Sequence, residues 1–260
     1  MSKWMMCWLI SSLWLGQAMA QTPAEKGLQI AQEVSDRDNG FKDMTADTRM
    51  VLKNRQGEES TREMRNMTLE MADDGDRLLV VFNTPRDVKG TAFLSYTHVE
   101  GEDDQWLYLP ALKRVKRIST RNKTGPFMGS EFAYEDLVSQ EVEKYTHAFQ
   151  RMEDLDGINC FVNERIPVDR RSGYSKQLAW IDSERYIPLK IEFYDRKGDH
   201  LKTLAWLDYQ QYKDQYWRAS RMHMVNHQTG KETMLHWENI QFMNGLTERE
   251  FSQSGLKNVR

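Results

Sequence analysis

Three sets of residues in this sequence are of types that could do chemistry. His223 and His227 have the four-residue spacing with which two imidazoles on one face of a helix chelate a metal. Glu135 and Asp136 are adjacent carboxylates, the groups that general acid–base catalysis uses. Cys160 is the one cysteine beyond the N-terminal twenty residues, and a thiolate there would be a nucleophile.

The surroundings of these residues argue against each site. The run from Met222 to Val225 has the pattern of a strand, on which four residues span about 13 Å, too far for two rings to share an ion. Adjacent acids are common at surfaces and caps, and the apolar run around Cys160 predicts a small buried residue. The sequence also has no Gly-x-Ser-x-Gly elbow and no phosphate-binding Gly-Lys loop. We therefore predict no enzyme, no cofactor and no metal.

A run of basic residues is the strongest charge feature. Six of them fall within eleven positions that contain no acid: Lys113, Arg114, Lys116, Arg117, Arg121 and Lys123. We expect Arg114, Lys116 and Arg117 to contact anionic lipid headgroups or an acidic partner. The alternative is a solvated hairpin edge whose charges discourage pairing with another chain. A formal net charge of −3, with acids and bases interspersed, does not indicate a nucleic-acid partner.

The N-terminus has the pattern of a cleavable export signal. Lys3 precedes a charge-free run over residues 4–15, and Ala18-Met19-Ala20 places small residues where a signal peptidase reads. The run is shorter than the roughly 20 apolar residues that span a bilayer. We therefore expect residues 1–20 to be a signal peptide and the mature chain, from Gln21, to act in the periplasm. A retained membrane anchor is the alternative.

The mature chain is predicted to open with one helix and continue as strands. Thr22-Pro23 supplies a cap and a first-turn proline, Glu25 completes the capping-box spacing, and the helix should end near Asp38-Asn39-Gly40. Beyond it, Gly- and Asp-rich turns separate short β-prone runs at hairpin spacing. This pattern predicts about ten or eleven antiparallel strands. No linker composition divides residues 21–260, which favours one domain.

The predicted strands have more apolar surface than the predicted helix can cover. Several runs are apolar on both faces, and about 25 helical residues cannot cover about ten strands. We therefore predict a mainly β (α+β) fold, an incomplete antiparallel β-barrel with a few helices plugging its concave side. Adaptable methionines suit the lining of an apolar cavity, although the barrel could instead be filled by its own side chains. The predicted lipid-binding lining or lid residues are Met64, Phe82, Trp106, Tyr108, Phe127, Met128, Trp180, Trp206, Met222 and Met224.

One apolar loop interrupts the strand pattern. Pro126-Phe127-Met128 lies between Gly125 and Gly129, and glycines on both sides let a backbone swing without strain. The loop could therefore be a movable lid or docking loop. The alternative is a static plug in which Phe127 is ordinary core.

Four blocks of the sequence closely resemble a known family. They are DVKGTAFL at 87–94, DQWLYLPALKRVKRI at 104–118, GPFMGSEFAYEDL at 125–137 and SGYSK at 172–176. The chain resembles the outer membrane lipoprotein-sorting protein family, a branch of the LolA/LolB-like superfamily, over residues 24–251. The resemblance implies an incomplete barrel whose cavity holds acyl chains during transport across the periplasm. It also implies an RND/MMPL-type inner-membrane transporter as a partner, because this branch is often encoded beside such exporters.

The leading hypothesis is a non-catalytic carrier or chaperone for the acyl chains of lipoproteins or lipids. Burying a methylene contributes about 0.8 kcal/mol, so about eight methylenes supply roughly 6 kcal/mol before ordering costs. The runner-up is a non-catalytic adaptor of a transporter with a filled core, and a lipid hydrolase is third. Lipoprotein, free lipid, sterol-like molecule and other amphiphile all stay open as cargo.

Overall fold

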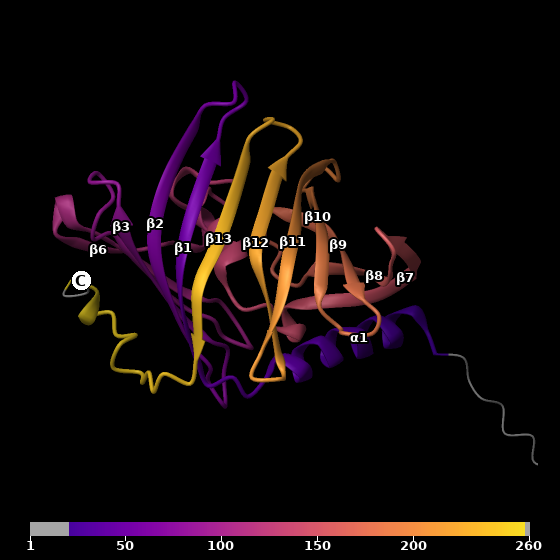
Figure 1. Cartoon of the computed structure of the whole chain (residues 1–260). Coiled ribbons are helices and arrows are strands. Elements are labelled where there is room, and N and C mark those ends of the chain that lie inside the picture. The colour runs from indigo at the N-terminus through magenta and orange to yellow at the C-terminus, as the bar shows by residue number, and fades with distance from the viewer. Residues whose placement is uncertain (1–20, 258–260) are drawn as a thin grey trace, which may run out of the picture.

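A computed structural model describes residues 21–257, and the predicted export signal lies outside them. The described chain forms one antiparallel sheet that curls but does not close (Figure 1). It has thirteen strands rather than the ten or eleven predicted, and the shortest of them are β4 and β6, with five and four residues. The strands are β1 Asp43–Lys53, β2 Glu59–Leu69, β3 Arg77–Thr84, β4 Ala92–Tyr96, β5 Asp104–Leu109, β6 Arg114–Arg117, β7 Tyr145–Leu155, β8 Ile158–Pro167, β9 Tyr174–Asp182, β10 Pro188–Asp195, β11 His200–Tyr212, β12 Tyr216–Asn226 and β13 Glu232–Phe242.

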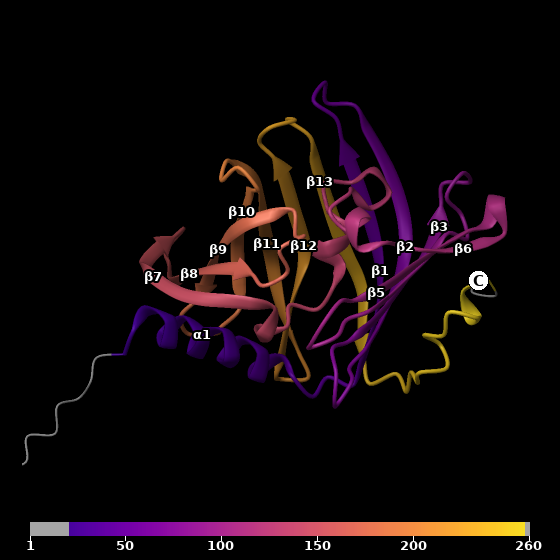
Figure 2. The same ribbon diagram turned by 180° about the vertical axis from the view of Figure 1, so that it is seen from behind.

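The strand order explains how the chain closes the open side of the sheet. The order is β6-β5-β4-β3-β2-β1-β13-β12-β11-β10-β9-β8-β7, so the first and last strands pair in the middle. The chain leaves the sheet at one edge, β6, and re-enters at the opposite edge, β7. Residues 118–144, here called the crossing segment, must therefore traverse the concave side, as Figure 2 shows.

The single α-helix of the described chain, α1 (Pro23–Asp38), begins and ends as predicted. The Thr22 side chain accepts from the Glu25 backbone, and the Glu25 carboxylate accepts from the Thr22 backbone in return. The helix lies across β7, where a Cβ at Gly27 would come 2.6 Å from the backbone nitrogen of Phe149. The Asn163 amide donates to the Gly27 carbonyl at 3.0 Å. Glycine at this position lets the helix approach the sheet edge closely.

The crossing segment fills the concave side next to β2–β5. It is built from short 3₁₀ turns: η2 Thr120–Asn122, η3 Phe127–Gly129, η4 Tyr134–Leu137 and η5 Val142–Lys144. Phe127 is 1% exposed, and its ring lies 5.8 Å from that of Phe82 and 5.3 Å from that of Phe93. Arg62 of β2 donates to the Met128 carbonyl. Phe127 is thus packed as core, as the static plug requires, and movement of the loop stays a prediction to be tested.

A second apolar cluster lies on the opposite, convex face of β2–β5. Side chains alternate between faces along a strand, so Leu79, Leu94 and Trp106 pair across the sheet away from the crossing segment. The C-terminal residues cover them, with Phe251 and Leu256 both buried in the cluster. The part of the sheet under these residues is therefore apolar on both faces, as predicted from the sequence.

The crossing segment gives the first prediction. Replacing Phe127 by Ala should lower the free energy of unfolding by about 3–5 kcal/mol, as for a truncated core aromatic. Chemical denaturation of the mature protein measures the loss. Leu112→Ala is the control, because Leu112 is 63% exposed and should lose little. A loss at Phe127 as small as at Leu112 would show that the loop is not part of the core.

Candidate functional site

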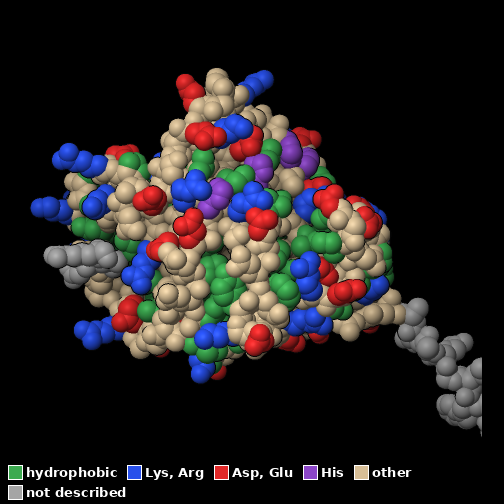
Figure 3. Space-filling view, in the orientation of Figure 1, with side chains coloured by type: hydrophobic (Ala, Val, Ile, Leu, Met, Phe, Trp, Pro, Cys, Tyr) green, Lys and Arg blue, Asp and Glu red, His purple; other side chains and the backbone are tan. Residues whose placement is uncertain are grey.

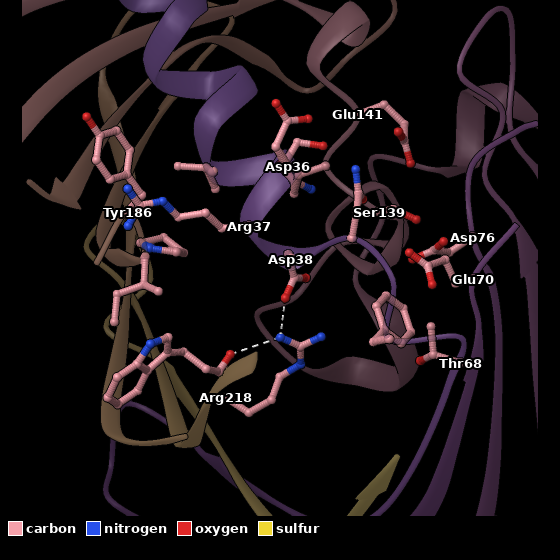
Figure 4. A pocket seen from close by; sticks show the side chains of 18 of the residues that line it. Asp36, Arg37, Asp38, Thr68, Glu70, Asp76, Ser139, Glu141, Tyr186 and Arg218 are labelled. Carbon is pink, nitrogen blue, oxygen red and sulfur yellow. Dashed lines mark hydrogen bonds and ion pairs between the residues drawn. The ribbon is translucent and has the colours of Figure 1, made fainter. Parts of the chain in front are cut away.

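A large cavity opens beside the crossing segment, over the other half of the concave face. Its volume is about 1860 Å³, above the roughly 300–1,000 Å³ of pockets that take small molecules. Its sides are the C-terminal half of α1, the turn between β2 and β3, and residues 139–145. Figure 4 shows this cavity with side chains from these elements facing across it.

The floor of the cavity is apolar. Ala179 of β9 pairs with Ile191 of β10, and Trp206 of β11 pairs with Met222 of β12. Partners in adjacent strands have side chains on the same face, so these residues form a continuous surface. We call this surface the apolar wall. It comprises Ala179, Ile181, Ile191, Trp206, Met222 and Trp237, all of which border the cavity. Ala179, Ile181 and Ile191 are almost fully buried in the core, whereas Trp206, Met222 and Trp237 are partly exposed.

The rim of the cavity is polar and mostly acidic. Glu70, Asp76 and Glu141 lie together on one side, while Arg218 pairs with Asp38 on the other (Figure 4). Burial, reinforced by the charges of Glu141 and Glu70, raises the pKa of Asp76 to about 7. Burial likewise raises the pKa of Glu141. The cavity therefore has an apolar floor and a rim whose charge changes near neutral pH.

The structure divides the predicted lining residues among three environments. Trp206 and Met222 line the cavity. The crossing segment or the surrounding core covers Met64, Phe82, Phe127 and Met224, and Met128 packs at the edge of that core. Trp106, Tyr108 and Trp180 lie on the convex face, so they do not line the cavity. Trp180 instead has the Lys190 ammonium 3.5 Å from its ring and donates to Glu153.

The basic run lies on the edge strand β6 and its flanks. Arg114, Lys116 and Arg117 are all exposed there, and Arg117 also pairs with Asp104 of β5. Lys123 is buried, and its ammonium donates to the Asp103 carbonyl at 2.6 Å. Positive and negative side chains are also interspersed over the convex face (Figure 3). The run is thus partly structural, and its exposed part borders an unpaired sheet edge.

The residues first considered for chemistry have internal partners. His223 bonds to Glu232 at 2.8 Å, and His227 bonds to Thr203 at 2.8 Å. No three His, Cys, Asp or Glu side chains within residues 21–257 are grouped to hold a metal. Burial raises the pKa of the Cys160 thiol to about 11, which keeps it protonated and unreactive.

The adjacent acids Glu135 and Asp136 attach the crossing segment to the sheet. Asp136 pairs with Lys202 at 2.6 Å, with both side chains buried, and accepts from the Tyr174 hydroxyl at 2.7 Å. Glu135 accepts from Ser172 and Gly173, while burial and the neighbouring Asp136 raise its pKa to about 7. Losing one partner of such a buried pair leaves a costly unpaired charge. Structural anchoring accounts for these carboxylates.

Two groups of cavity residues were not predicted from the sequence. Trp237 and Ile181 belong to the apolar wall, and period-2 alternation along their strands was a usable signal for both. Tyr145, His147, Asn163 and Arg165 form a polar patch on β7 and β8. Nothing local in the sequence distinguishes these four from solvated strand residues, because their burial depends on α1 and the crossing segment.

Comparisons with known proteins give the family. A family model described as "-like: Uncharacterized protein" matches residues 74–258. A crystal structure of an outer membrane lipoprotein-sorting protein domain from Vibrio parahaemolyticus is 58% identical, covers 90% of this chain and 99% of its own, and has a TM-score of 0.89. The chain belongs to the outer membrane lipoprotein-sorting protein family.

Other members of this family's structural class are more distant. A DUF1329 family protein from Desulfovibrio piger is 29% identical, covers 90% of this chain and 99% of its own, and has a TM-score of 0.85. A LolA superfamily protein from Nitrosomonas europaea is 19% identical over 88% of this chain and 98% of its own, with a TM-score of 0.70, and shares the fold. No curated protein matches this chain. Within residues 21–257, no helix has both the length and the hydrophobicity to cross a bilayer.

The acidic rim gives the second prediction. Asp76 is protonated up to about pH 7 in the folded protein but only to about pH 4 in the unfolded chain, so the native state binds more protons between these values. Its contribution to the free energy of unfolding is therefore full below about pH 4 and is lost as the pH rises towards 7. Asp76→Asn should raise the melting temperature at about pH 8 and flatten this loss.

The measurement is the melting temperature of wild type and variant at a series of pH values from about 4 to about 8. Glu135 and Glu141 titrate in the same direction, so the pH dependence should shrink without disappearing. Asp73→Asn, at an exposed position on the same turn, is the matched control. An Asp76→Asn variant that is less stable than wild type at about pH 8 would contradict the assigned pKa.

Proposed function

We propose that this protein is a non-catalytic periplasmic carrier or chaperone that binds the acyl chains of lipoproteins or lipids. The observation that carries the proposal is the apolar wall, which forms the floor of a cavity of about 1860 Å³ inside an incomplete barrel. Family membership supports the same conclusion, because a relative with 58% identity is described as a lipoprotein-sorting domain.

Burial of the acyl chain against the apolar wall would drive binding. Each methylene removed from water contributes about 0.8 kcal/mol, and part of the total is spent on ordering the chain. A cavity that stays open at its rim allows the chain to leave again when an acceptor offers a similar apolar surface. The carrier therefore needs no covalent chemistry, which agrees with the internal partners of its His, Cys and paired acidic residues.

The family resemblance also suggests a protein partner. An RND/MMPL-type inner-membrane transporter is the proposed partner, because this branch of the family is often encoded beside such exporters. The exposed Arg114 and Lys116 on the edge strand suit contact with anionic headgroups or an acidic partner surface. Arg117 is exposed as well, so its remaining donors could join that contact while it stays paired with Asp104.

A structural adaptor with a filled core is the second candidate. The half of the concave face under Phe127 is indeed filled by the chain itself, which is what the adaptor requires. The unfilled half over the apolar wall favours the carrier. Lipid binding by the purified protein distinguishes the two, since only the carrier should retain or take up an extractable amphiphile.

The third prediction tests the carrier directly. Lipid-stripped mature protein should bind a fluorescent fatty-acid probe, and natural lipid should displace it. Met222→Glu should weaken probe binding about tenfold or more, because an acyl chain would have to desolvate a carboxylate on the apolar wall.

Met152→Glu is the matched control, because Met152 is 41% exposed and does not line the cavity. Circular dichroism checks that both variants remain folded. If Met222→Glu and Met152→Glu weaken probe binding equally, the lipid does not lie against the apolar wall. If the stripped wild-type protein binds no probe at all, the filled-core adaptor is the better account.

A further inference from the structure

One arginine in the cavity has no acidic partner. Arg165 lies on β8, and its Nε donates to the Gln177 side chain at 2.6 Å. Its guanidinium lies 5.0 Å from the centre of the Tyr145 ring. Among residues 21–257 Arg165 forms no direct ion pair, although the charge of Asp136 acts on it from a distance. The bond from Nε to Gln177 is its one side-chain hydrogen bond in that range, so its two terminal Nη groups have no acceptor there. Its anchored geometry therefore leaves the outer edge of the guanidinium free.

The other arginines that line the cavity are each paired. Arg37 pairs with Glu33, Arg185 with Asp182, and Arg218 with Asp38. An unpaired charge removed from bulk water is costly, and proteins usually satisfy a half-buried guanidinium with a carboxylate. Burial lowers the pKa of Arg165, because removing the guanidinium from water disfavours its charged form. Arg165 lacks such a carboxylate, which indicates that a ligand from outside the chain supplies the anionic partner.

Arg165 lies directly beside the apolar wall. Across the β8–β9 ladder, Arg165 pairs with Gln177 and Asn163 pairs with Ala179. Ala179, the first residue of the apolar wall, is thus a diagonal neighbour of Arg165 on the same face of the sheet. On the other side Arg165 faces His147 of β7. The His147 Nε2–H donates to the Val142 carbonyl at 3.0 Å, and burial lowers the pKa of His147, so it is neutral at pH 7. Arg165 is therefore the positive charge on this part of the floor.

We propose that the cargo is an amphiphile with an anionic head, a carboxylate or a phosphate, and that Arg165 binds this head. The two Nη groups present parallel donors that match a carboxylate or phosphate in a two-pronged contact. The acyl chain then runs from Ala179 along the apolar wall past Trp206 and Met222. This assignment rests on the carrier function proposed above and narrows its cargo.

Equilibrium dialysis with laurate, dodecyl phosphate and dodecanol tests the assignment, since the three share one chain and differ in the head. The wild-type protein should bind laurate or dodecyl phosphate about tenfold or more tighter than dodecanol, as a charge-assisted pair contributes. Arg165→Met should lose this preference while still binding dodecanol as wild type does. Arg165→Lys should recover only part of it, because an ammonium lacks the fork geometry.

The controls distinguish binding of the anionic head by Arg165 from the carrier function itself. Arg151→Met, which removes an arginine outside the cavity, should leave all three affinities unchanged. The melting temperature of Arg165→Met should equal or exceed that of wild type, so a lost preference would not reflect misfolding. Equal binding of laurate and dodecanol by wild type would overturn the assignment and leave the carrier standing. Failure of all three ligands to bind would overturn the carrier itself. A preference between laurate and dodecyl phosphate would identify the head.

Discussion

The structure depends on the need to connect two opposite edges of one curled sheet. Because β6 and β7 are consecutive in the chain and lie at the two ends of the strand order, residues 118–144 must cross the concave side. The crossing is stabilised by Phe127, which packs among aromatic rings, and by the buried Lys202–Asp136 pair. The connection therefore also serves as core for a sheet that a single α-helix covers within residues 21–257.

This solution leaves the two halves of the concave face different. Beneath Phe127 the apolar side chains are covered by the chain itself, whereas Trp206, Met222 and Trp237 of the apolar wall are partly exposed to a cavity. The C-terminal half of α1 forms one side of that cavity, and the close contact at Gly27 holds the helix on β7. A filled half that holds its shape and an open half that accepts a chain are what a reusable carrier requires. Under the proposed assignment, Arg165 at the edge of the open half would hold the head of the cargo and so fix the direction of its acyl chain.

The sequence predicted the features that local chemistry decides. The capping box at Thr22 and Glu25, the hairpin pattern and the shortage of helical cover follow from residues close together in the chain. Alternation also predicted which strands are apolar on both faces, but it could not say which face is concave. Trp106 and Trp180 were therefore grouped with Trp206, although they lie on the convex face. Arg165 gave no signal, because its lack of a partner is a property of three strands, a helix and the crossing segment together.

The central claim is that an acyl chain lies against the concave apolar wall, and photo-crosslinking tests it most directly. A fatty acid that carries a diazirine near the end of its chain is bound to the lipid-stripped protein, irradiated and located by peptide mass spectrometry. The account predicts adducts on the peptides that contain Trp206, Met222 and Trp237, competed away by natural lipid. Adducts concentrated on the peptide with Trp106 and Tyr108, or labelling no stronger than that of the unfolded protein, would contradict it.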